Sequence, residues 1–194
     1  MPAQVSPQKP NPLNNTQLST WEDYLALPDD GLRYELLEGV LCMVPSPSRI
    51  HQEIVGQLHL QIAQHLKYRN LGKVFIAPFD VKLSDTNVVQ PDLIYLRSEN
   101  LGILTEQNIC GVPDLVVEVL SPSTAVRDRL HKMSLYAKFG IKEYWVVWPR
   151  EQIIEVLSLE NGIFQTQKVL TTADVLTTEI IPGLEIKLCE LWEE

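Results

Sequence analysis

Two carboxylates stand inside apolar runs of this 194-residue sequence. Glu118 lies in residues 115–120, LVVEVL, a run that is typical of a strand buried on both faces. Asp92 follows Pro91 inside a second run of this kind, residues 88–96. Burying a charge is costly unless it is compensated. Each carboxylate must therefore be protonated, paired with a cation or bound to a metal ion.

Two carboxylates on neighbouring strands suit a hard divalent cation. Mg²⁺ prefers an octahedron of oxygen atoms, which two carboxylates can build together with water and phosphate oxygens. Pro91 marks a strand start, an edge or a bulge, where the next side chain can be turned into a site. The alternative is a structural ion pair at Glu118. If that ion pair is structural, Glu118→Gln leaves its buried cationic partner without a counter-charge and destabilises the protein. If Asp92 and Glu118 instead repel each other, Glu118→Gln should leave the stability of the metal-free protein unchanged or increase it.

A longer pattern surrounds the two carboxylates. Residues 113–124, PDLVVEVLSPST, are followed by an Arg-Asp pair, by Lys132 and by residues 140–145, GIKEYW. From Tyr34 to Trp145 the sequence resembles the Uma-type family of "putative restriction endonucleases", a bacterial branch of the PD-(D/E)XK nuclease superfamily. The resemblance implies an α/β fold with a restriction-endonuclease-like central mixed β-sheet, flanked by helices and extended by β-hairpins. It also implies hydrolysis of phosphodiester bonds with Mg²⁺ or Mn²⁺ as cofactor, and nucleic acid, expected to be DNA, as partner.

The resemblance assigns roles to particular residues. Asp92 and Glu118 match the two acids of the superfamily motif, which makes them catalytic residues and metal ligands. The motif continues with a lysine two residues after the glutamate, but this sequence has Leu120 there. The resemblance therefore points to a lysine displaced onto the following helix, Lys132, whose long side chain can reach back to the strand end. The alternative for Lys132 is a surface ion pair with Asp128.

The resemblance also implies a further acid from an N-terminal element. Glu35, in the first strand of a hairpin at residues 33–44, is the candidate for an additional ligand or a hydrogen-bond acceptor in the catalytic site. Glu38 competes for this role. Its position in the Glu38-Gly39 turn favours exposure to solvent.

Charge bears on the partner. The formal net charge of −9 disfavours sequence-independent binding of a polyanion. Residues 127–142 differ from the rest of the chain, because they contain five Lys or Arg residues and one Asp. This stretch is either a solvated helix face or a surface that faces phosphates. The candidate nucleic-acid contacts are Arg127, Arg129, Lys138, Lys142 and His51, the last in the first turn of a predicted helix.

The elements that must hold these residues can be read from the hydrophobic pattern. Apolar residues every fourth position, from Ile50 to Leu66, predict a helix that Ser48 caps. Two long strands, 74–83 and 88–96, are expected to pair through the turn at 84–87. A helix at about 125–139 between strands 115–120 and 143–148 predicts a parallel pair. Residues 153–170, around Asn161-Gly162, predict another hairpin.

The domain organisation is expected to be simple. Residues 1–18, rich in Pro, Asn and Gln, are read as a disordered or draped arm, and residues 19–194 as one domain. No apolar run approaches the roughly 20 residues of a membrane span, no signal-peptide core is found, and a cytoplasmic location is expected. Three scattered cysteines support neither a disulfide framework nor a zinc site. The sequence leaves open whether the chain forms a homodimer. Two functions also stay open: a metal-dependent nuclease, or a catalytically inactive module of the same fold that binds nucleic acid or protein.

Overall fold

The computed structural model describes residues 19–121 and 131–192. Its helices are α1 (Trp21–Leu25), α2 (Arg49–Leu66) and α3 (Met133–Phe139), with the 3₁₀ helices η2 (Ser98–Ile103) and η4 (Leu188–Leu191). Its strands are β1 (Arg33–Leu37), β2 (Val40–Val44), β3 (Gly72–Ile76), β4 (Asp80–Ser84), β5 (Asn87–Val89), β6 (Leu93–Arg97), β7 (Asn108–Cys110), β8 (Leu115–Val119), β9 (Glu143–Trp148), β10 (Ile153–Glu160), β11 (Ile163–Leu170), β12 (Val175–Leu176) and β13 (Ile186–Lys187). The expected arm, residues 1–18, lies outside the described residues.

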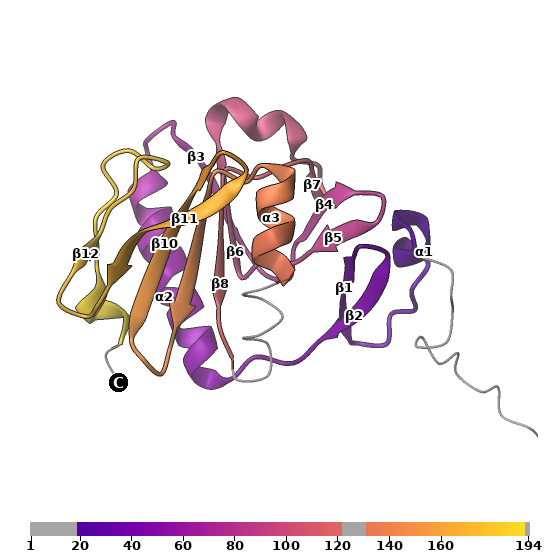
Figure 1. The fold of residues 1–194 in the computed structure, drawn as a ribbon, viewed down its shortest axis with the longest axis horizontal. Helices are drawn as coiled ribbons and strands as arrows, with labels where there is room; N and C mark the ends of the chain where they lie inside the picture. The colour runs from indigo at the N-terminus through magenta and orange to yellow at the C-terminus, as the bar shows by residue number, and fades with distance from the viewer. Residues whose placement is uncertain (1–18, 122–130, 193–194) are drawn as a thin grey trace, which may run out of the picture.

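A six-stranded mixed sheet forms the centre of the fold, in the order β11-β10-β9-β8-β6-β3. β8 and β9 run parallel, as the strand-helix-strand order predicts, and the other neighbours are antiparallel. α3 covers one face of this sheet and α2 the other (Figure 1). The mixed sheet with flanking helices and the two predicted hairpins, now β1–β2 and β10–β11, are confirmed.

A second sheet, in the order β2-β1-β5-β4-β7, lies beside the first (Figure 1). The two long strands predicted at 74–83 and 88–96 are wrong in one respect, because each is divided between the two sheets. β5 ends at Val89 in the five-stranded sheet, and β6 begins at Leu93 in the six-stranded sheet. Pro91 lies in this interruption, where its missing N–H removes a ladder donor. Asp92 therefore lies at the junction of the two sheets and not inside a strand.

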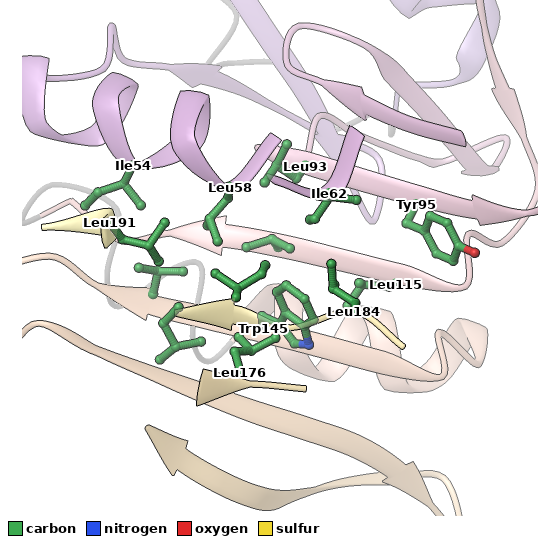
Figure 2. Close-up of a cluster of buried hydrophobic side chains, with 14 of the residues drawn as sticks. Ile54, Leu58, Ile62, Leu93, Tyr95, Leu115, Trp145, Leu176, Leu184 and Leu191 are labelled. Atoms are coloured by element: carbon green, nitrogen blue, oxygen red, sulfur yellow. The ribbon is translucent and has the colours of Figure 1, made fainter. Parts of the chain in front are cut away.

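The larger core lies between α2 and the six-stranded sheet. Ile54, Leu58 and Ile62 of α2 point toward Leu93, Leu115 and Trp145 of the sheet, and C-terminal residues such as Leu184 close the cluster (Figure 2). This arrangement follows from the four-residue spacing of the apolar residues, which places them on one face of the helix. Ile50, the first member of the predicted stripe, is the exception, with 50% of its surface exposed.

α3 connects the parallel strands β8 and β9 and ends at Gly140, whose φ of +84° is a left-handed cap. The first part of the helix predicted at 125–139, with Arg127 and Arg129, lies outside the described residues. In the part of the chain that is described, no helix is long and apolar enough to cross a membrane.

Candidate active site

The register of β6 and β8 brings the two acids to the same level of the sheet. Leu93 lies opposite Val117 in this antiparallel pair, so the next positions outward are Asp92 and Glu118. Glu118 shares the α3 side of the sheet with its alternate neighbours Val116 and Leu120. Both carboxylates line one cavity of about 40 Å³. Carboxylates on opposite faces of the sheet would have excluded a shared ion.

The β1–β2 hairpin and the residues that follow it also line this cavity, with Arg33, Val44, Pro45, Ser46 and Pro47. Three more segments contribute polar side chains. Lys132 comes from the start of α3, His51 from the first turn of α2, and Gln90 from the junction between β5 and β6. Ser121 follows β8 and also lines the cavity. The residues that meet here are separated by up to 99 positions in the sequence, from Arg33 to Lys132, so only the tertiary fold assembles the site.

Lys132 lies between two buried carboxylates. Its Nζ atom is 2.9 Å from Oε1 of Glu118 and 2.8 Å from Oε1 of Glu35. All three side chains are at most 5% exposed. The backbone N–H of Gln90 also donates to Oε1 of Glu35, at 2.9 Å. The ion-pair cluster that we weighed as an alternative at Glu118 is thus present, and Lys132 is directed toward Glu118 as the nuclease resemblance implies.

Tyr136 is a second donor to Glu118. Its hydroxyl group donates to Oε1 of Glu118 at 2.7 Å, and the side chain is fully buried. Burial, together with the negative charges of Glu118 and Glu35, raises the pKa of Tyr136 well above its ordinary value. Tyr136 therefore stays neutral and keeps its proton for Glu118. It is four positions after Lys132, so both side chains leave α3 on the same face.

Asp92 is held by two donors of different kinds. The backbone N–H of Val119 donates to Oδ2 of Asp92 at 2.7 Å, and Nε2 of His51 is 3.0 Å from the same oxygen. Ser48 caps α2 by accepting from the backbone N–H of His51, which fixes the first turn that carries the imidazole. His51, predicted as a nucleic-acid contact, is placed against Asp92, and only 11% of its side chain is exposed.

Glu35 and Glu38, the two candidates for the additional acid, differ in burial and in their partners. Glu35 has no exposed surface and contacts Lys132. Glu38 is in the β1–β2 turn, and 54% of its side chain is exposed. Its carboxylate pairs with Lys138 at 3.4 Å and with His131 at 3.6 Å. Of the two, Glu35 is the one that belongs to the buried cluster.

Lys138 and Lys142, two of the basic residues predicted to contact nucleic acid, lie at different places relative to the candidate site. Lys138 of α3 is 63% exposed and has Glu38 as its partner. Lys142 lies 3.4 Å from Asp114, which precedes β8, at the other end of this strand from Glu118. Four residues of extended chain span about 13 Å, so the expected position of Lys142 next to Glu118 does not hold.

The donor set fits one divalent ion of the Mg²⁺ type. Among residues 19–121 and 131–192, no three His, Cys, Asp or Glu side chains are grouped so that they could hold a metal. Mg²⁺ does not need such a cage, because it is commonly bound through one or two carboxylates and keeps several waters. Asp92 and Glu118 provide two hard oxygen donors in a cavity that has room for an ion.

The six-stranded mixed sheet with flanking helices places the chain in the restriction-endonuclease-like fold class. Residues 21–189 match the model of the Uma2 family, described as "putative restriction endonuclease", and the chain belongs to this family. The chain is also similar to the crystal structure of a putative nuclease belonging to DUF820 from Anabaena variabilis, with a TM-score of 0.75 and 20% identity. That similarity covers 89% of this chain and 97% of the other, and it concerns the fold. No curated protein matches the sequence.

Sequence reasoning missed Tyr136 and Gln90 as parts of the site. The spacing of four between Lys132 and Tyr136 is the signal that could have identified Tyr136, because a phenol on the same helix face as that lysine meets the same acids. Gln90 acts through its backbone N–H, which no side-chain pattern reveals.

Proposed function

We propose that this protein is a metal-dependent endonuclease that hydrolyses phosphodiester bonds of DNA, with Mg²⁺ or Mn²⁺ as cofactor. The observation that carries the proposal is that Asp92, Glu118 and Lys132, from three elements, line one cavity in a chain of the Uma2 family. Asp92 and Glu118 would hold the ion. The ion would supply neutralising charge for the phosphorane and a water that is nucleophilic near neutral pH.

Lys132 would offset the negative charge that grows on the phosphate. Its ammonium group lies between two carboxylates, which favours its protonated form and its use as a hydrogen-bond donor. A protonated lysine can donate a hydrogen bond to the attacking water or to the phosphate, whereas only a neutral lysine can take a proton from that water. Donation is therefore the role that fits Lys132 better. Glu35 would act as a positioning residue, since it holds Lys132 from the closed side of the cavity.

Asp92 and Glu118 each have a group that fixes them. The N–H of Val119 and the imidazole of His51 hold one oxygen of Asp92, and Tyr136 holds one oxygen of Glu118. A carboxylate that is oriented before the substrate arrives loses little entropy when it binds an ion. These contacts support the proposal because they orient the acids.

The test is cleavage of supercoiled, linear and single-stranded DNA with Mg²⁺ or Mn²⁺, and with chelator as the control. We expect cutting of at least one substrate, and its loss in Asp92→Ala and Glu118→Ala. Lys132→Ala should bind metal and cut about 10²- to 10⁴-fold more slowly, as for removal of a charge-stabilising group. Thermal melts of every variant show whether it is folded.

A catalytically inactive module that binds nucleic acid or protein is the second candidate. Two observations favour it: Leu120 stands in the usual lysine position, and the Lys132 ammonium group, 2.9 Å from Glu118, compensates the charge of this buried carboxylate. Calorimetric titration of Mg²⁺ and Mn²⁺ distinguishes the two candidates before any substrate is known. Absence of metal binding, and cutting no faster than an Asp92→Ala, Glu118→Ala double variant, would replace the nuclease proposal by the binding module.

A further inference from the structure

A second and larger cavity, of about 530 Å³, lies beside the candidate active site. This volume is in the range of small-molecule pockets, roughly 300–1,000 Å³. Its described walls come from the first turn of α2, the end of β8 and the end of β9 with the turn that follows. Ser121 lines both cavities, so the two are neighbours.

The position of this cavity is typical of a ligand site. β8 and β9 run parallel, and the cavity is at their carboxyl ends, the end at which parallel strands of open α/β sheets bind ligands. The first turn of α2 contains no acidic residue, and a helix N-terminus carries a partial positive charge. Arg49 and Arg150 add two cations to the wall, and Glu151 is its described acid. Arg49 pairs with Glu53 of α2 at 2.6 Å, but both side chains are exposed, so Arg49 can exchange this partner for a phosphate at low cost. The rim therefore suits an anion.

The interior of the cavity is apolar and aromatic. Trp148, Ile50 and Leu120 line it. Ile50 is the member of the α2 stripe that was expected to be buried and is half exposed. Leu120 occupies the position in which the resemblance predicts a lysine. At this position the chain thus presents an apolar wall next to the candidate catalytic acids, and such a wall suits the face of a ring better than a phosphate.

We propose that this cavity binds an unpaired nucleobase adjacent to the phosphodiester that is to be cut, with the base stacked on Trp148. The inference rests on the proposed function and narrows its substrate to nucleic acid with an unpaired base: a single strand, a loop or a flipped-out nucleotide. Bases inside a duplex are paired and stacked on one another, so they do not reach such a wall. The Arg49 and Arg150 guanidinium groups then face the flanking phosphates.

The net charge supports this substrate class. A chain of charge −9 gains little affinity for DNA from counterion release. Stacking of a base on an aromatic side chain supplies affinity that does not depend on net charge, and every base has a face that can stack. An acidic nuclease with an aromatic cavity beside its acids is thus better matched to unpaired than to duplex nucleic acid.

The test measures binding and not turnover. A fluorescently labelled single strand, the same strand as a duplex, and a single strand with one abasic nucleotide are titrated with the full chain in chelator. We expect the single strand to bind more tightly than the duplex. Trp148→Ala should weaken single-strand binding about tenfold or more, which corresponds to the loss of one stacked base. Trp148→Phe keeps an aromatic face and should restore most of the affinity.

The controls use matched pairs. Ile50→Ala should weaken single-strand binding, whereas Ile163→Ala, at an exposed isoleucine of β11 outside the cavity, should not. The abasic strand should bind the parent more weakly than the intact strand and should not distinguish the parent from Trp148→Ala. Thermal melts of the four variants verify the fold.

The outcomes separate this inference from the proposed function. Equal single-strand affinity in the parent, Trp148→Ala and Trp148→Phe overturns the inference, and so does cutting confined to duplex DNA, which leaves the nuclease proposal standing. Single-strand binding that depends on Trp148, without any metal-dependent cutting, supports the inference and overturns the catalytic proposal. A parent that neither binds nor cuts nucleic acid overturns both.

Discussion

Lys132 is compatible with both explanations for the buried acid Glu118, a structural ion pair and a catalytic site. Its ammonium group satisfies Glu118 and Glu35 in the absence of a metal ion, and it is also the group that a nuclease would direct at the phosphate. A structural and a catalytic role are therefore compatible in one side chain. They predict different orders of stability among variants.

Lys132→Met should be the most destabilising of the single changes in this cluster. It leaves two buried carboxylates without their cation, and removing one partner of a buried pair costs roughly 3 to 5 kcal/mol. Glu118→Gln leaves Lys132 paired with Glu35, at 2.8 Å, and Tyr136 can still donate to the amide oxygen. Its cost should be near that of one hydrogen bond, about 1 kcal/mol. Urea unfolding in chelator measures both values.

The unfolding of the same variants in the presence of Mg²⁺ is the control. An ion that binds only the folded state should raise the unfolding midpoint of the parent in Mg²⁺ and should not raise that of Glu118→Gln. If Glu118→Gln is as unstable as Lys132→Met, the Glu118–Lys132 pair is needed for folding. An increase in the stability of apo Glu118→Gln would instead agree with repulsion between Asp92 and Glu118.

At the scale of residues, the sequence predicts which side chains matter better than it predicts their partners. A charge inside an apolar run is a strong signal, because burial without compensation is so costly, and it identified Asp92 and Glu118. The pairing of His51 with Asp92 depends on where the first turn of α2 meets β8, and no local pattern encodes that. The contact of Lys142 with Asp114 depends in the same way on tertiary structure.

At the scale of elements, the first turn of α2 contributes residues to both cavities. His51 faces the candidate active site, and Arg49 and Ile50 face the cavity proposed for a base. The Ser48 hydroxyl group fixes this turn by accepting from the backbone N–H of His51. The N-cap therefore stabilises a helix and orients residues of two sites.

Ser48→Ala should destabilise the protein by about 1 kcal/mol, the usual cost of losing an N-cap oxygen. For a chain of this length, the melting temperature should fall by about 2 to 4 °C. Ser48→Asp, which keeps an acceptor at the same position, is the matched control and should melt close to the parent. A Ser48→Ala protein that melts with the parent would show that tertiary packing alone holds the first turn.

Most elements were predictable, and the exceptions have a physical cause. The helix cap at Ser48, the hairpins and the parallel crossover follow from local chemistry and spacing. The division of strands 74–83 and 88–96 between two sheets was missed, because each apolar run continues through its break and only Pro78 and Pro91 hint at the two breaks. Ile50 was expected in the core for a similar reason: periodicity identifies a face of the helix but not where the sheet beneath it ends.

At the scale of the molecule, charge and shape set how nucleic acid can approach. The formal charge is −9, and the described basic residues near the site are few. Lys138 is paired with an exposed glutamate, Glu38, and exposed pairs contribute little stability. It can exchange this partner for a phosphate at low cost. Lys187 of β13, which pairs with β12 at the other side of the molecule from α3, offers a surface lysine far from the site (Figure 1).

Lys138→Ala should therefore weaken binding of single-stranded DNA and make its affinity less dependent on salt, without abolishing turnover. Each phosphate contact contributes about −0.7 to the slope of log K against log salt for a single strand, so the slope should become shallower by about that amount. Lys187→Ala should leave both the affinity and the slope at the parent values. Anisotropy titrations over a range of salt concentrations measure the three slopes. If Lys138→Ala and Lys187→Ala have equal slopes, Lys138 belongs to a solvated helix face, and contact with nucleic acid is confined to the two cavities at the start of α2.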